Sequence, residues 1–258
     1  MIKRSFFSLF FCLLICGSNF AQSLESDFGI DHVIVAVPDL EKATETYSKL
    51  GFTIKPGRLH QNGLSNNHIK LKDGSSLELM TVIGEPGDKM AKAYQDFLDT
   101  KEGGIYIALK APFELVMEKA DELGLHYQVS FGDPFSYLTF ENEELGNVFF
   151  INYSRSFSDP DSILTHSNNV VGIESVWIKA SPLFTKLLTS LGASSGGKLK
   201  TPDTKENPVY SLNGYDFIID ETTSEDSGIM GIQFKRADIL PKEWLPPSEN
   251  HGVWIMLR

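Results

Sequence analysis

The sequence predicts an α+β protein made of tandem βαβββ modules, whose curved mixed sheets carry their helices on the outside. Its composition is globular, since 41% of the 258 residues are hydrophobic and 22% are charged, which is enough for a core without disulfide help. A unit of one apolar strand, one amphipathic helix ending in Leu-Gly and two or three further strands recurs along the chain. Such recurrence indicates repeated supersecondary units.

The first module has the clearest pattern. β-Branched residues over 29–37 favour a strand over a helix. Pro38 and Asp39 open a helix that Gly51 can close in the left-handed conformation, and an Asp-Gly pair later in the module is typical of a hairpin turn. The remaining elements that we expect are a strand over 52–54, a loop over 56–66, a strand over 67–71 and a last strand over 75–80.

The same order of elements predicts further modules. The second has strands over 104–109, 137–140 and 147–153, with a helix over 112–123. The third has strands over 172–178, 209–212 and 215–219, with a helix that ends at Leu-Gly 191–192, and strands over 231–234 and 253–256 form a partial fourth. The predicted domains are therefore a two-module domain over 29–153, a linker over 154–170, and the third module with the partial fourth over 171–258.

The N-terminus predicts export. A short basic start precedes an apolar run over 5–16 that is too short to span a bilayer, and small residues follow it. This order is typical of a signal peptide over 1–21, cleaved near Ala21 to leave a periplasmic or secreted chain. The alternatives are a buried first helix and a lipid anchor on Cys16. The rest of the sequence contains no apolar run of transmembrane length, so we expect no integral membrane segment.

Charge and motifs narrow the partners. The formal net charge of −11 disfavours binding to nucleic acid or to anionic lipid. The sequence contains neither a glycine-rich phosphate loop nor a Gly-x-Ser-x-Gly nucleophile elbow. We therefore expect the partner to be a small-molecule substrate or ligand.

The first module resembles a known family. Its opening Ile-Asp-His-Val-Ile-Val-Ala-Val-Pro-Asp-Leu and the Leu-Gly-Phe after its helix resemble the vicinal oxygen chelate superfamily of glyoxalases, extradiol dioxygenases and bleomycin-resistance proteins. Pro-Gly-Arg-Leu-His at 56–60 and Asp-Gly-Ser-Ser-Leu-Glu-Leu at 73–79 are similar to its glyoxalase-like domain branch. The resemblance implies paired modules that curl into a cup. It also implies a divalent metal, Zn, Fe, Mn or Ni, on inward His, Gln or Glu side chains.

Strand alternation places the candidate side chains, because residues two apart share a face of a strand. His32 in the first strand and Glu78 in the last both lie opposite the Val and Leu residues that would pack under the helix, and His68 and Lys70 share one face of the strand between them. A nitrogen and a carboxylate on neighbouring strands suit a metal site. With the resemblance, this implies His32, Glu78 and His68 as metal ligands, and Glu78 and His60 as catalytic residues.

The second module does not repeat these ligands. The position of His32 falls there on Tyr106 or Ile107, and that of Glu78 falls on Phe150. A metal site would be half complete, since catalytic ions usually have three protein ligands, unless another His or the second chain of a homodimer completes it. The candidate contacts to a substrate are Lys70, Tyr106, Phe150 and His166.

Each candidate also has a structural interpretation. His32 could bond a backbone carbonyl, His68 could be an exposed strand residue, and Lys70 could lie on solvated surface with its charge in water. Glu78 is different, because a buried carboxylate without a partner is costly.

The resemblance implies two functions. The first is an exported metal-dependent enzyme of the lyase, isomerase or dioxygenase type, acting on a small oxygen-rich compound. The second is a metal-free protein of the bleomycin-resistance type that sequesters a small hydrophobic or zwitterionic molecule in an aromatic cup, which includes Tyr106 and Phe149 or Phe150. The presence of His32 and Glu78 favours the first, and the missing ligands of the second module favour the second. A purely structural role is the third hypothesis.

Overall fold

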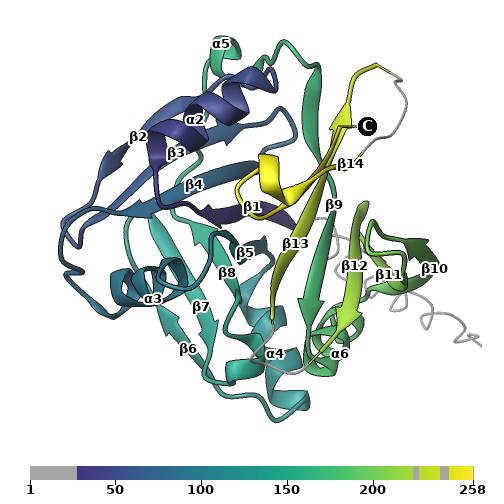
Figure 1. Ribbon diagram of the computed structural model, residues 1–258. Helices are drawn as coiled ribbons and strands as arrows, with labels where there is room; N and C mark the ends of the chain where they lie inside the picture. Colours follow the sequence, from purple (N-terminus) through teal and green to yellow (C-terminus); the bar gives the residue numbers. More distant parts are fainter. Residues whose placement is uncertain (1–27, 223–226, 239–243, 258) are drawn as a thin grey trace, which may run out of the picture.

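The computed structural model of the chain describes residues 28–222, 227–238 and 244–257 (Figure 1). The expected signal peptide over 1–21, with both cysteines, lies outside these residues. The described chain has the mixed α+β architecture that the sequence predicts, with helices covering a large sheet. None of its helices is long and apolar enough to cross a membrane.

The first module comprises β1 (Gly29–Ala36), α2 (Leu40–Lys49), β2 (Lys55–Leu59), β3 (Leu64–Lys70) and β4 (Ser76–Val82). The Asp39 side chain caps α2 by accepting a hydrogen bond from the Lys42 backbone N–H at 3.0 Å. Gly51 follows α2 with φ of 90°, as its predicted role requires. The strand expected over 52–54 is absent, and the chain instead forms β2 from Lys55, largely within the segment that we expected to be a loop.

The second module comprises β5 (Gly103–Lys110), α4 (Phe113–Glu122), β6 (Tyr127–Ser130), β7 (Phe135–Phe140), the 3-10 helix η2 (Glu143–Leu145) and β8 (Val148–Tyr153). An additional helix, α3 (Lys89–Leu98), precedes it. The repeat does not predict α3, since it lies between two modules rather than within one.

The third module comprises β9 (Val170–Ala180), α6 (Pro182–Ser190), β10 (Ser194–Lys200), β11 (Glu206–Leu212) and β12 (Tyr215–Glu221). The partial fourth comprises β13 (Gly228–Arg236), β14 (Trp244–Leu245), the 3-10 helix η4 (Pro247–Glu249) and β15 (Trp254–Leu257). The short α5 (Asp161–Leu164) lies in the linker. The glycine-rich β10 is a strand that the sequence pattern did not reveal.

One pairing rule repeats through the molecule: the first and last strands of a module run side by side in parallel. The pairs are β1 with β4, β5 with β8, β9 with β12, and β13 with β15. Antiparallel pairing of β1 with β5 and of β9 with β13 then joins the modules two by two. We call residues 29–153 the first module pair and residues 170–257 the second module pair.

A single antiparallel contact, Ile229 with Gly104, joins the two module pairs into one sheet. The order along its main path is β10-β11-β12-β9-β13-β5-β1-β4-β3-β2 (Figure 1). A Cβ on Gly104 would lie 2.4 Å from the Ile229 Cβ, so the junction requires glycine at this position.

The two faces of the first module pair differ. Val33, Val35, Leu77 and Leu79 are fully buried in the main core. The opposite face, which carries His32, is only partly covered, by Ile34, Ala36 and Met80 packed with Tyr94 of α3. We call it the His32 face, and it holds the candidate site.

Candidate functional site

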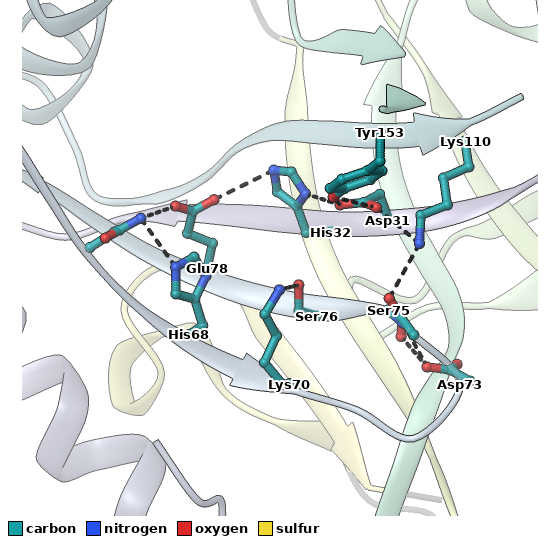
Figure 2. Close-up of polar contacts among 12 residues, drawn as sticks. Asp31, His32, His68, Lys70, Asp73, Ser75, Ser76, Glu78, Lys110 and Tyr153 are labelled. Atoms are coloured by element: carbon teal, nitrogen blue, oxygen red, sulfur yellow. Dashed lines mark hydrogen bonds and ion pairs between the residues drawn. The ribbon is translucent and has the colours of Figure 1, made fainter. Parts of the chain in front are cut away.

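Two rows of side chains cross the His32 face, each running from strand to strand through paired residues. The first row is Lys70, Ser76, His32, Ala108 and Phe149. The second row is His68, Glu78, Ile34 and Tyr106. Alternation correctly placed His32, Glu78, His68 and Lys70 on one face, as Figure 2 shows.

A bulge in β1 turns Asp31 towards His32. The pairing of β1 with β5 shifts between Ile30 and His32, which leaves Asp31 out of the ladder and re-aims its side chain. The Asp31 carboxylate lies 2.5 Å from His32 Nδ1, and each of its oxygens accepts a hydrogen bond from the Tyr153 hydroxyl at 2.8 Å. Lys110 Nζ lies 3.0 Å from Asp31 Oδ2. This carboxylate, which is only 3% exposed, is fully partnered.

The environment of Asp31 fixes its charge. Burial alone would raise the pKa of this carboxyl, but the hydrogen bond from His32 and the charges of His32 and Lys110 outweigh it. They hold the Asp31 pKa well below its usual value. An ionised Asp31 can only accept hydrogen bonds, so the proton between the two side chains belongs to His32 Nδ1.

Asn66 determines the hydrogen-bonding roles of Glu78 and His68. Its Oδ1 accepts a hydrogen bond from the Arg58 backbone N–H at 3.0 Å, so the other end of the amide must be the donating Nδ2. That Nδ2 donates to Glu78 Oε1 at 2.5 Å and lies 3.2 Å from His68 Nε2. Glu78 and His68 Nε2 are therefore both acceptors.

His68 is consequently a neutral imidazole that carries its proton on Nδ1. Burial lowers its pKa to about 4, and the charge of Glu78 offsets only part of this effect. His68 Nδ1 is buried and has no hydrogen-bond partner within the described chain. The nitrogen that Asn66 occupies is then not free to bind another group.

These constraints leave one pair of unmatched atoms. His32 Nε2 lies 3.4 Å from Glu78 Oε2, and Glu78 is only 8% exposed. With the imidazole proton on Nδ1, both facing atoms are hydrogen-bond acceptors. Two such atoms repel each other unless they share a proton or a metal ion lies between them.

Aromatic side chains border the same pair on the side of the second module. Phe149 meets His32 edge to face, with ring centroids 5.8 Å apart, and Tyr106 and Tyr137 lie 6.4 Å and 6.0 Å from Phe149. Burial raises the pKa of Tyr106 and of Tyr137, where Glu78 contributes further. These phenols therefore remain protonated. The site is polar on one side and aromatic on the other.

Phe150 does not line this site. It is fully buried in the main core beside Phe140, and Phe149 occupies the position that we assigned to it. Strand pairing shows the one-residue error, because Ala108 pairs with Phe149 as Ile34 pairs with Glu78. The same register assigns the position of His32 to Tyr106 and not to Ile107.

The other two candidate histidines, His166 and His60, form no contact with His32 or Glu78 among the described hydrogen bonds. His166 accepts a hydrogen bond from the Thr53 N–H at 2.9 Å, and its other nitrogen lies 3.0 Å from the Lys70 carbonyl oxygen. Both of its nitrogens thus fasten the linker to the first module. His60 lies in the turn after β2. No hydrogen bond in the described ranges joins it to His32 or Glu78, and its buried Nε2 has no partner there.

The donor set fits a metal ion only in part. Two ligand atoms of one tetrahedral ion lie about 3.4 Å apart, which matches His32 Nε2 and Glu78 Oε2. Asp31 also braces His32 as carboxylates brace metal-binding histidines. However, the described residues contain no group of three His, Cys, Asp or Glu that could hold an ion. The chain supplies two ligands where a catalytic ion usually has three.

Sequence reasoning missed Asp31 and Asn66, and it chose Phe150 over Phe149, which it had named only as an alternative for the aromatic cup. Alternation excluded Asp31, because nothing in the sequence marks the bulge. Asn66 shares the parity of His68 and Lys70, so an earlier start for β3 would have found it. The error at Phe149 came from counting residues from the turn instead of pairing the strands.

Comparisons with known proteins agree with this fold. A sequence profile described as a glyoxalase-like domain matches residues 30–191. A hypothetical protein from Staphylococcus aureus superposes with a TM-score of 0.63 and 17% identity, over 89% of this chain and 98% of its own. No curated protein sequence matches this chain.

Two dioxygenase structures are also similar. Homoprotocatechuate 2,3-dioxygenase from Arthrobacter globiformis has a TM-score of 0.53 and 13% identity, over 84% of this chain and 66% of its own. A variant of the same enzyme from B. fuscum has a TM-score of 0.58 and 12% identity, over 91% of this chain and 73% of its own. At these identities the likeness concerns the fold alone.

Proposed function

Because the chain belongs to the glyoxalase-like domain family, we propose that its His32 face binds a small oxygen-containing molecule and transfers a proton on it. His32 and Glu78 are the acid–base pair in this proposal. The observation that supports it is the 3.4 Å separation of His32 Nε2 and Glu78 Oε2, two atoms that no other side chain occupies among the described residues. The other nitrogen of His32, Nδ1, and the other oxygen of Glu78, Oε1, are already held by Asp31 and Asn66.

The surrounding residues suit a proton transfer. Asp31 stabilises the imidazolium that forms when His32 Nε2 takes a proton, and it keeps the ring oriented towards Glu78. Asn66 holds Glu78 Oε1, so that Oε2 is the oxygen free to give or accept a proton. Phe149 and Tyr106 limit the access of water from one side. A hydrogen on a carbon next to a carbonyl or carboxyl group is the proton that such a pair could remove.

The direct test is hydrogen exchange in D2O. Small 2-oxo acids, 2-hydroxy acids, ketones and amides are incubated with the protein, and loss of the C–H signal is followed by proton NMR. We expect exchange in at least one compound, and a decrease of about 10²–10⁴-fold in both Glu78→Gln and His32→Gln. The exposed His126 is the matched control, and His126→Gln should leave the rate unchanged.

Two results would contradict the acid–base proposal. Exchange that persists in both variants would place the chemistry elsewhere. Ligand binding without exchange, in a protein that keeps its fold, would instead support the metal-free sequestration protein that the aromatic side of the site suggests.

A divalent ion between the same two atoms is the second candidate, and the separation that matches a tetrahedral ion favours it. The test is metal analysis of protein purified without chelator. Stoichiometric metal that is lost in both His32→Ala and Glu78→Ala would favour the ion over the proton. Metal that is absent or unchanged in the variants would exclude this pair as its site.

Export is a separate part of the proposal. The basic start, the apolar run and the small residues before position 22 support a cleaved signal peptide. Intact-mass measurement of the protein from an exporting bacterial host should show a mature chain that begins near Gln22. A chain that retains Met1, or one that carries lipid on Cys16, would contradict it.

A further inference from the structure

The ammonium group of Lys70 lies in the first row of the His32 face without an acidic partner. Its Nζ donates a hydrogen bond to Ser76 Oγ at 3.3 Å, and no ion pair joins it to a carboxylate of the described chain. The neighbouring lysines differ, since Lys110 lies 3.0 Å from Asp31 and Lys55 pairs with Asp159. Asp31, Asp159 and Glu78 act on its charge only from beyond ion-pair distance, so Lys70 is a cation with no carboxylate in contact.

This arrangement is costly for the folded protein. The Lys70 side chain is half-buried, and its removal from water lowers its pKa. The more distant charges of Asp31, Asp159 and Glu78 offset part of this effect, but one neutral hydroxyl does not replace the hydration that the partly buried ammonium loses. A charged group that lowers stability in the free protein suggests that a ligand of opposite charge binds to it.

Other unmatched donors lie close to Lys70. His68 stands two residues before it on the same face of β3, and the proton on His68 Nδ1 has no acceptor in the described chain. Ser76 is 1% exposed, and its hydroxyl oxygen accepts from Lys70. Figure 2 shows Lys70, Ser76 and His68 beside Glu78 and His32 on one face. A ligand with acceptor oxygens and a negative charge would satisfy these donors.

We propose that Lys70 and Ser76 form an anion-binding subsite beside the acid–base pair, and that the substrate is a small organic carboxylate. This inference rests on the proposed function, because it places the reacting carbon at His32 and Glu78. Ser76 pairs with His32 across β4 and β1, and neighbouring strands lie about 4.8 Å apart. The carboxylate must therefore lie within one or two bonds of the reacting carbon.

A single ammonium and one hydroxyl fit a monoanion. The neighbouring lysines cannot add a second positive charge, since Lys55 and Lys110 already pair with their own carboxylates. A dianionic phosphate would leave charge uncompensated here. The substrate class is thus a 2-hydroxy or 2-oxo carboxylate, whose second oxygen reaches the His32–Glu78 pair.

Mandelate and mandelamide are suitable probes, because they have the same ring and hydroxyl group and differ in the charge of the carboxyl group. Binding to the full mature chain is measured by titration calorimetry. We expect the acid to bind at least about tenfold more tightly than the amide, the effect of one partly buried ion pair. Lys70→Met should remove this preference by weakening the acid and leaving the amide unchanged.

Lys72 provides the matched control, because it is exposed on the same hairpin and Lys72→Met removes the same charge. That variant should keep the preference for the acid. Thermal unfolding adds a second measurement, since Lys70→Met should unfold at the same or a higher temperature if the ammonium is kept for a ligand. A structural role for Lys70 predicts a lower temperature.

The result separates this inference from the proposed function. In His32→Gln the preference for the acid should survive while exchange is lost, because Lys70 binds the carboxylate and His32 transfers the proton. No binding of mandelate, equal binding of acid and amide, or a preference that persists in Lys70→Met would each overturn the anion subsite. Loss of exchange without these results would leave the subsite standing.

Discussion

The two module pairs share one topology but differ at the positions that would carry chemistry. Strand pairing aligns His32 with Ser175, and Glu78 with Ile218. Where the first pair has an imidazole facing a carboxylate, the second therefore has a hydroxyl and a fully apolar side chain. The same fold thus presents facing polar groups in one half and packed apolar groups in the other.

Large aromatic side chains fill the second module pair at the equivalent place. Tyr106 corresponds there to Gly231, and a Cβ on Gly231 would lie 3.1 Å from the Trp244 ring. Trp244 packs edge to face on Trp177, with ring centroids 6.3 Å apart. The space that a side chain would occupy on β13 is taken by an indole from β14.

Polar side chains beside the equivalent position of the second module pair bond to one another. Ser175 donates to Gln233 at 3.3 Å, and Gln233 donates to Glu174.

Buried polar atoms without a partner occur in both halves of the described chain. They include His60 Nε2 and His68 Nδ1 in the first module pair, and Trp177 Nε1 and Thr185 Oγ1 in the second. The halves therefore differ in the kind of group, since the first has imidazole nitrogens where the second has an indole N–H and a hydroxyl.

The largest effect that we expect is a difference in stability between a substitution in the second module pair and one at the His32 face. Trp177 is 1% exposed, so Trp177→Ala should lower the free energy of unfolding by about 3–5 kcal/mol. Phe149 lies on the partly open His32 face, so Phe149→Ala should lower the free energy of unfolding by only about 1–2 kcal/mol. Urea denaturation measures both.

Exchange activity completes this comparison. Phe149→Ala should impair exchange even where the protein stays folded, whereas Trp177→Ala should not change it below the unfolding transition. Equal stability losses for the two variants, or exchange that depends on Trp177, would remove the distinction between the halves.

The next effect concerns pH. An unfolded His68 takes up a proton as the pH falls through its ordinary pKa of 6.5, while the folded residue stays neutral down to its lowered pKa of about 4. The unfolded chain then binds more protons, so the free energy of unfolding should fall between these values by up to about 3 kcal/mol. Asp31, whose folded pKa is depressed, adds a loss only at lower pH.

His68→Gln should flatten the stability profile between pH 6.5 and 4, and His126→Gln serves as an exposed control that leaves it unchanged. Urea unfolding at half-unit intervals of pH measures the profile. A His68→Gln protein with the same slope as the parent would show that folded His68 is charged, and would contradict the proton assignment made through Asn66.

Sequence reasoning went far for the fold and part of the way for the site. β-Branched runs and Leu-Gly helix ends were enough to find the repeated units, because both depend on local sequence. Alternation also brought His32 and Glu78 to one face. The roles of these residues remain predictions, since the geometry admits both a proton and an ion.

What the sequence could not provide depends on contacts between strands. The bulge that turns Asp31 inward exists only in the register of β1 with β5. The choice of Phe149 over Phe150 likewise depends on which residue pairs with Ala108. Helix α3 was missed for another reason, because the repeated pattern gave no place to a helix between modules.

The smallest effect tests how β2 holds the site. A Cβ on Gly57 would lie 2.1 Å from Asn66 Oδ1 and 2.2 Å from its backbone oxygen, and the backbone atom cannot turn away. Gly57→Ala should therefore cost about 1–3 kcal/mol of stability and displace the amide that holds Glu78, with slower exchange.

Gly196, in the corresponding strand of the second module pair, gives the matched control for this substitution. Its added Cβ would first meet the Ser211 hydroxyl oxygen, at 3.1 Å, and a shift of a few tenths of an ångström would relieve this contact. Gly196→Ala should therefore change stability by less than about 1 kcal/mol and leave exchange intact. Equal losses of stability in the two variants would mean that the contact of β2 with Asn66 is no closer than the contact of β10 with β11. The amide of Asn66 would then be held by its hydrogen bonds alone.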